Sequence, residues 1–173
     1  ITFIGNVSVN GGGMYISYSR PNLTRVDFYN NHSSNEGGAV FIDNSSPTFI
    51  NASFVDNSAI NKGGGISNLS SFPLFINSIF NGNTSVGSGG GIYNDQSDPV
   101  LLQTTFYGNI AVNHGGAISN NWASHGIIQN SILWGNQAAT GAQIYNETGS
   151  TQNIAYSNIQ NCGSSIGGYI STC

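Results

Sequence analysis

Apolar residues fall along this chain in short alternating runs that recur every 26 residues. One phase of the repeat holds a phenylalanine followed three positions later by an asparagine, and it contains Phe28, Phe54, Phe80 and Phe106. A second phase is a glycine-led phrase ending in an apolar residue, whose six copies begin at Gly11, Gly37, Gly63, Gly89, Gly115 and Gly141. The prolines occupy a third phase, at Pro21, Pro47, Pro73 and Pro99. Such regular self-similarity predicts a repeat architecture.

Apolar positions alternate within each repeat and turn residues separate them, which predicts about three short apolar strands per repeat and no helix. A leucine-rich repeat has a similar period, but it needs a Leu-rich signature and a helix or similar segment on its convex side. This chain has few Leu, and its Gly-Gly pairs stand where they would weaken a helix. We therefore predict an all-β protein, a parallel β-helix solenoid of about six to seven coils of 26 residues. Residues 1–173 form a single domain in this interpretation, either a segment of a longer chain or a unit of a stacking filament.

Stacked coils place equivalent residues about 4.8 Å apart, so each phase of the repeat becomes a column. The phenylalanine column and the aliphatic column are predicted to form the core. The asparagine after each phenylalanine is predicted to form a hydrogen-bonded amide ladder, as in other stacked parallel strands. Two more ladders are expected where strands end, one containing Asn68, Asn94, Asn120 and Asn146, the other Asn51, Asn77, Gln103 and Asn130. Glu36 and Lys62 are neighbours in a further column and should form a surface ion pair.

Charged residues make up only 6% of the chain and the formal net charge is -4. This composition, rich in Asn, Ser and Gly, also occurs in disordered segments, but aromatic residues at 11% and the strict repeat argue against disorder. A chain with three Lys and Arg has no basic surface for nucleic acid. No apolar run approaches the length of a membrane span, so membrane insertion is not expected.

Glycosidic-bond chemistry needs two carboxylates at a suitable separation or acidic calcium ligands. The candidate acids are Asp43, Asp95, Glu147 and Asp98. The first three share one column but stand in alternate coils, which predicts spacings near 10 Å. The histidines His32, His114 and His125 lack metal-ligand spacing. We expect no enzymatic activity, no cofactor and no metal site.

A column on the outer side of one strand is rich in aromatic residues and contains Tyr15, Phe41, Tyr93 and Tyr145. Exposed tyrosines can stack against sugars or pack against another protein, so this column is a candidate ligand-contact face. Aromatic residues also favour strands for structural reasons alone, and that alternative stays open. Because it points outward, Tyr93 should contribute much less to stability than Phe80.

The repeated Gly-Gly-Ala-Ile and Phe-x-x-Asn phrases resemble those of polymorphic outer-membrane protein repeats and related right-handed parallel β-helix surface proteins, and the resemblance implies a right-handed winding of the coils. Residues 130–145 also look like the last coils of bacterial secreted β-helix proteins of the choice-of-anchor type. The resemblance implies a structural or adhesive β-helix of a bacterial surface protein, fibre or matrix, with a glycan or cell-surface ligand as partner. The alternative that it carries is a polysaccharide-binding or polysaccharide-degrading protein, since pectinolytic enzymes share the fold.

Two further expectations concern the ends of the chain. Cys162 and Cys173 fall in the last coil, where a disulfide would suit a secreted or surface location, although two free thiols are the alternative. Ladder residues begin at once with Phe3, and solenoids need polar capping repeats to stay soluble. End-to-end self-association is therefore expected unless further coils cover the ends.

Overall fold

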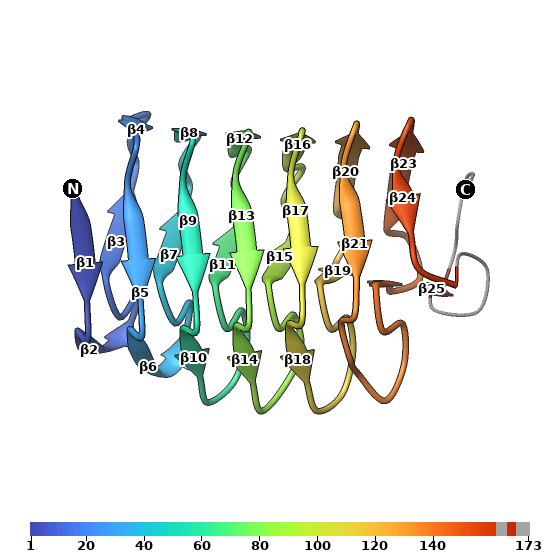
Figure 1. Ribbon diagram of the computed structural model, residues 1–173, viewed down its shortest axis with the longest axis horizontal. Helices are drawn as coiled ribbons and strands as arrows, with labels where there is room; N and C mark the ends of the chain where they lie inside the picture. The colour runs from blue at the N-terminus through green and yellow to red at the C-terminus, as the bar shows by residue number, and fades with distance from the viewer. Residues whose placement is uncertain (162–165, 169–173) are drawn as a thin grey trace.

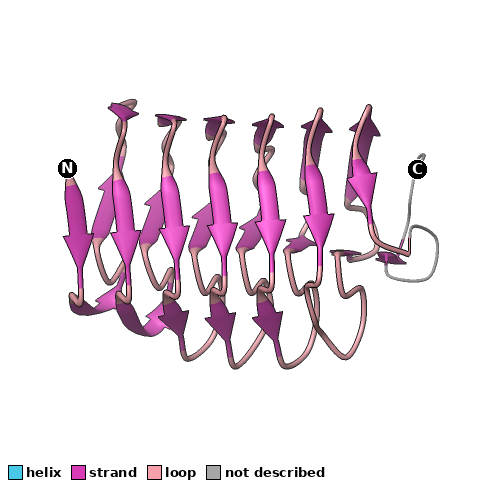
Figure 2. Ribbon diagram, viewed as in Figure 1, coloured by secondary structure: helices cyan, strands magenta, loops and turns pink. Residues whose placement is uncertain are grey.

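The computed structural model describes residues 1–161 and 166–168 of the chain. Throughout this part the chain forms short strands joined by tight turns, without a helix (Figure 2). Equivalent strands of consecutive coils lie side by side along one axis (Figure 1). The front strands run downward, the chain crosses to the back along the bottom and returns upward, and the coils advance from left to right. This winding is right-handed, so the predicted parallel β-helix with about 26 residues per coil is confirmed.

The strands form four parallel sheets, which we name A to D in the order in which the first coil enters them. Sheet A faces the viewer in Figure 1 and contains β1 (Thr2–Ile4), β5 (Asp27–Tyr29), β9 (Ser53–Val55), β13 (Ile79–Asn81), β17 (Thr105–Tyr107), β21 (Ile132–Trp134) and β24 (Asn158–Ile159). Sheet C lies behind it and contains β3 (Met14–Ser17), β7 (Val40–Asp43), β11 (Ile66–Leu69), β15 (Ile92–Asp95), β19 (Ile118–Asn121), β22 (Ile144–Asn146) and β25 (Ile166–Gly168).

Two smaller sheets close the coils below and above. Sheet B runs along the bottom of Figure 1 and contains β2 (Val7–Asn10), β6 (His32–Glu36), β10 (Ser58–Ala59), β14 (Thr84–Ser85) and β18 (Ile110–Ala111). Sheet D lies at the top and contains β4 (Asn22–Thr24), β8 (Thr48–Ile50), β12 (Leu74–Ile76), β16 (Val100–Leu102), β20 (His125–Gln129) and β23 (Thr151–Ala155).

Most described coils therefore have four strands, namely the three apolar strands that were predicted and one more that was not. The additional strand belongs to sheet B, where β10 and β14 are two residues long and consist of Ser, Thr and Ala. Such small polar residues give no alternation of apolar and polar positions, so the pattern that reveals the other strands is missing here.

Aromatic and aliphatic columns fill the interior, as predicted. Phe80 is fully buried, and its ring stacks on Phe54 and Phe106 with centroids 4.6 and 4.5 Å apart. The ring of Phe75, from sheet D, packs against the Phe80 ring in a T-shaped arrangement, with the two ring centroids 5.5 Å apart. The aliphatic column on the opposite side is also fully buried and consists of Val40, Ile66, Ile92, Ile118 and Ile144.

Of the three predicted ladders, the two buried ones are present, and the described residues show one hydrogen bond of the exposed third ladder. In the buried ladder beside the phenylalanines, the Asn57 amide donates to Asn83 Oδ1 at 3.0 Å, and the Asn83 amide donates to Asn109 Oδ1 at 2.9 Å. Asn77, at the end of a sheet D strand, donates to Asn51 Oδ1 and has a left-handed φ of 48°. The Asn68 column also forms a ladder, but it lies inside the strands of sheet C and not at their ends.

Glycine pairs form the corner between sheets B and C. Gly37 has φ of 68°, a left-handed conformation that favours glycine. Gly38 follows it, and a Cβ atom there would collide with the carbonyl oxygen of Gly64 in the next coil. The corner is therefore too tight for a side chain.

Candidate functional site

The predicted ligand-contact column lies on the outer face of sheet C, but most of it is not exposed. Tyr15 is 52% exposed and Tyr145 is partly buried, whereas Phe41 and Tyr93 are only 7% and 3% exposed. The expectation of a continuous exposed aromatic face is therefore wrong at Phe41 and Tyr93. The reason for expecting Tyr93 to contribute much less to stability than Phe80 therefore no longer holds.

Side chains from the turns between sheets B and C lie over two members of this column, Tyr93 and Tyr145, because the glycine corner turns the chain back sharply. Lys62 Nζ lies 4.6 Å from the centre of the Tyr93 ring, and the His114 ring stacks on Tyr145 at 4.3 Å. The same Lys62 pairs with Glu36 at 3.7 Å, which confirms the predicted ion pair. Alternation along a strand shows which side a residue faces, but not what folds over it.

The electrostatics of this cluster follow from partial burial. Burial raises the pKa of the Tyr93 hydroxyl, although its hydrogen bond with Lys62 opposes the shift. Burial alone would lower the pKa of Lys62, but the hydrogen bond to Tyr93 and the surrounding negative groups raise it overall. Burial also raises the pKa of Asp95, opposed by Lys62 and assisted by Glu36. Lys62 is thus a firmly protonated cation and is poorly suited to act as a general base.

The candidate acids lie as the register predicted. Asp43 and Asp95 both pair with Leu69 of the intervening coil, so two strand spacings, about 10 Å, separate them. The other two acids bind backbone groups. Asp98 accepts a hydrogen bond from the His125 amide at 2.6 Å, and Glu147 accepts one from the Trp122 amide at 3.1 Å.

The histidines lie apart and contact different neighbours. His32 Nδ1 lies 2.9 Å from the Ser58 hydroxyl, and His125 Nδ1 lies 2.8 Å from the Thr151 hydroxyl. The described residues contain no group of three or more His, Cys, Asp or Glu arranged to hold a metal ion. Cys162 and Cys173, the predicted disulfide, lie outside the described residues.

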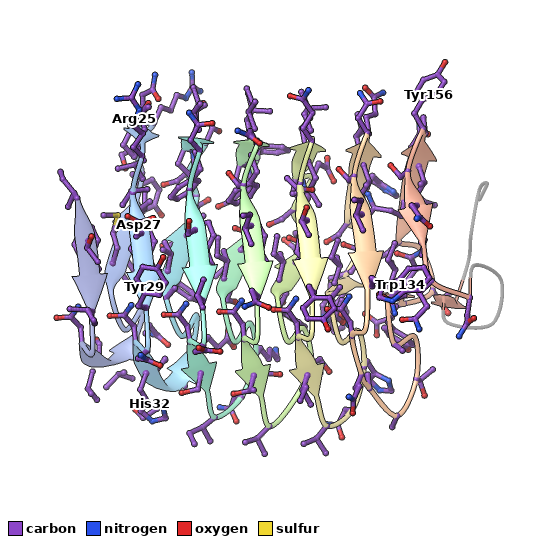
Figure 3. All side chains as sticks on the ribbon, in the orientation of Figure 1. Arg25, Asp27, Tyr29, His32, Trp134 and Tyr156 are labelled. Carbon is purple, nitrogen blue, oxygen red and sulfur yellow. The ribbon has the colours of Figure 1, made fainter. Side chains whose placement is uncertain are left out.

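Sheet A presents a second surface, which the sequence reasoning did not single out. Tyr107 and Trp134 are exposed neighbours on adjacent coils, and Ile79 and Ile132 are exposed in the next column, separated by Thr105. Trp134 stands on the face turned toward the viewer in Figure 3. We call these four residues the sheet A patch. The signal in the sequence that could have indicated this patch is an apolar residue at both outward positions of one strand, as at Ile132 and Trp134.

A groove of about 610 Å³ opens at the corner between sheets C and D in the first three coils. Tyr18 and Arg20 stand at one end and Phe72 at the other, and small residues line the middle. The sequence reasoning missed these three residues because they lie in turns, outside the strand pattern. Two aromatic residues in corner columns otherwise filled mainly by small or polar residues were the signal that it overlooked.

A parallel β-helix with in-register ladders defines a β-solenoid repeat protein. Three segments, residues 25–43, 77–95 and 103–124, match the family model described as the Chlamydia polymorphic membrane protein (Chlamydia_PMP) repeat. Each segment runs from the end of sheet D through sheets A and B to the end of a sheet C strand or just beyond. No curated protein and no solved structure matches the chain.

The match confirms the resemblance to polymorphic outer-membrane protein repeats. Together with the fold, it indicates a parallel β-helix surface repeat protein, of a kind found at the bacterial outer membrane or cell surface. Among the described residues there is no helix of the length and hydrophobicity that a membrane crossing requires.

Proposed function

We propose that this chain is a non-catalytic, adhesive part of a secreted or surface-displayed bacterial protein, and that it binds its target through the sheet A patch. The observation that carries the proposal is the exposure of Ile79, Tyr107, Ile132 and Trp134 on the outer face of sheet A. Contiguous exposed apolar residues typically mark a site of contact with another molecule.

The frame suits such a role because it holds the patch rigidly. Every strand of sheet A is fixed on its inner side by a stacked aromatic or aliphatic residue, as Phe106 and Leu133 are beneath Tyr107 and Trp134. Immobilised side chains lose less conformational entropy on binding, so a pre-ordered surface binds more tightly than a flexible one.

A polysaccharide-degrading enzyme is the less favoured function. Carboxylates that work together as acid and nucleophile stand about 5 Å apart, and those that work with an intervening water stand about 6.5–9.5 Å apart. Asp43 and Asp95 are separated by a full coil carrying Leu69. Asp98 and Glu147 already accept backbone hydrogen bonds.

Adhesion of protein-coated beads to cultured epithelial cells and to immobilised matrix tests the proposal. The double variant Tyr107→Thr, Trp134→Thr replaces both aromatic residues with threonine, the residue that Thr105 already places on the same face. It should reduce bead retention at least about fivefold if the patch makes the contact. Tyr156→Asn is the matched control, because Tyr156 is exposed at the top edge of the molecule, away from the patch (Figure 3). Failure of wild-type beads to adhere, or equal retention of the double variant, would refute adhesion through this surface.

A further inference from the structure

The corner groove is formed by a coil of small residues between two coils with large ones. Its residues fall in three columns: the first holds Tyr18, Asn44 and Ser70, the second Ser19 and Ser45, and the third Arg20, Ser46 and Phe72. Tyr18 and Phe72 belong to the first and third coils, which lie about 10 Å apart. Asn44 and Ser46 are too short to fill the interval. The resulting volume of about 610 Å³ is within the usual range for ligand sites.

Hydrogen-bonding groups in the groove are available to a ligand. In the described part of the chain, the side-chain hydroxyls of Ser19, Ser46 and Ser70 have no hydrogen-bond partner. The Asn44 amide donates to Asp43 at 2.7 Å, which leaves the Asn44 side-chain oxygen as an acceptor. Closely spaced hydroxyl and amide groups are complementary to the hydroxyl groups of a sugar.

The aromatic residues at the two ends are conspicuously exposed. Tyr18 is 80% exposed and Phe72 is 58% exposed, and neither side chain packs into the core. Tyr18 also holds a left-handed φ of 47°, a conformation that a bulky residue adopts with difficulty. The polar residues Asn44 and Ser70 occupy equivalent left-handed positions, so the turn itself does not require an aromatic residue.

Arg20 gives the groove its charge. It is one of three Lys and Arg in the chain, and within the described residues the single ion pair joins Lys62 to Glu36 instead. The nearby carboxylate of Asp43 accepts hydrogen bonds from Asn44 and Ser17. A guanidinium without an acidic partner, at the rim of a polar groove, is suited to bind a carboxylate with two parallel hydrogen bonds.

We propose that this groove binds an acidic polysaccharide, with a uronate carboxylate on Arg20 and the apolar faces of the sugar rings on Tyr18 and Phe72. The serine hydroxyls and the Asn44 oxygen bind the sugar hydroxyls between them. This site is separate from the sheet A patch, so bead adhesion and oligosaccharide binding test two independent statements.

An NMR titration with hexagalacturonate tests the proposal, with the fully methyl-esterified hexamer as the neutral probe. The acidic hexamer should shift the amide signals of Ser19, Asn44 and Ser70, and the neutral hexamer should bind at least about tenfold more weakly. An oligosaccharide of neutral sugars that carries sulfate groups in place of carboxylates is the third arm. Binding to it as tight as to hexagalacturonate would show that the groove selects charge and not the carboxylate.

Two pairs of variants separate the groove from general effects. Arg20→Gln should weaken hexagalacturonate binding at least about tenfold, whereas Arg25→Gln, an exposed corner residue outside the groove, should leave it unchanged. Tyr18→Asn should also weaken binding, whereas Tyr156→Asn, at the far end of the chain, should not (Figure 3). Both tyrosines have left-handed backbones that asparagine tolerates, so folding should persist, which far-UV circular dichroism checks. Equal binding of both hexamers, no binding of either, or equal effects of Arg20→Gln and Arg25→Gln would overturn the proposal.

Discussion

Removing a member of the buried asparagine ladder should destabilise the protein far more than removing an exposed asparagine from the corner between sheets D and A. Asn83 is fully buried and its side chain makes four hydrogen bonds. Its Oδ1 accepts from the backbone and side-chain amides of Asn57, and its Nδ2 donates to Phe54 O and Asn109 Oδ1. One side chain thus joins three successive coils.

The size of the effect follows from the groups that Asn83→Ala would leave behind. The backbone amide of Asn57 would lose its recorded partner, at a cost of about 1–3 kcal/mol for a buried donor. Asn57 Nδ2 and Asn109 Oδ1 each lose one hydrogen bond and keep another, and Phe54 O loses one, at a cost of about 1 kcal/mol each. The expected decrease in the free energy of unfolding is therefore about 4–6 kcal/mol.

Asn77→Gly is the matched control. Asn77 is exposed, donates one hydrogen bond to Asn51, and has a left-handed φ that glycine adopts without strain. Its loss should cost about 1 kcal/mol or less. Guanidinium titrations followed by circular dichroism compare the two variants with the wild type. Equal losses, or a loss below about 1 kcal/mol for Asn83→Ala, would refute the idea that the buried ladder stabilises the coils.

An isosteric variant adds a second signature. Asn83→Asp keeps the acceptor oxygen but replaces the donating amide with a second oxygen that faces Phe54 O and Asn109 Oδ1. Burial disfavours the charged form, so the new carboxyl group should have a higher pKa in the folded than in the unfolded state. Between the two pKa values the unfolded state binds fewer protons than the folded state. The free energy of unfolding should therefore fall as pH rises from the pKa of the unfolded state to that of the folded state. Denaturation midpoints measured from pH 3 to pH 8 should fall more steeply in the variant than in the wild type.

Two further predictions concern the core and the outer face of sheet C. Phe80→Ala should cost about 3–5 kcal/mol in a denaturant titration because the residue is fully buried between stacked rings, whereas Ile79→Ala, its exposed neighbour on β13, should cost about 1 kcal/mol or less. Equal losses would reverse the assignment of inner and outer faces. Asp95→Asn, which copies Asn121 of the next coil, should raise the denaturation midpoint at pH 7, because burial raises the pKa of Asp95 in the folded state and ionisation therefore disfavours folding. The gain should disappear as pH falls and Asp95 becomes protonated, and a gain independent of pH would contradict this explanation.

Sequence reasoning could predict the interior because stacking repeats one physical constraint in every coil. A phenylalanine beneath a phenylalanine and an asparagine beneath an asparagine are visible as columns once the period is known. A hydroxyl ladder was nevertheless missed: the Ser71 hydroxyl accepts from the Ser45 backbone amide and donates to Leu69 O. Serine is so frequent in this chain that a column of serines does not stand out from its surroundings.

The outer surface was less predictable, for reasons that are physical. The covering of Tyr93 by Lys62 depends on the angle at which the glycine corner returns the chain, and alternation carries no information about that angle. The groove exists because the side chains of Asn44 and Ser46 are small and leave space between Tyr18 and Phe72. A pattern of apolar residues shows where side chains pack, but it does not show where they leave a gap.

These differences between the interior and the corners indicate where specificity can arise in such a rod. An inner residue contacts its equivalents in the coils above and below, so a change at Phe80 must be accommodated by Phe54 and Phe106 together. A corner residue has no such constraint: the column that begins with Tyr18 continues with an amide, a hydroxyl and another amide, all with the same left-handed backbone. Corner side chains can therefore change one at a time without loss of the fold. A binding site formed at a corner, by two large residues on either side of small ones, thus requires few substitutions and costs the core nothing.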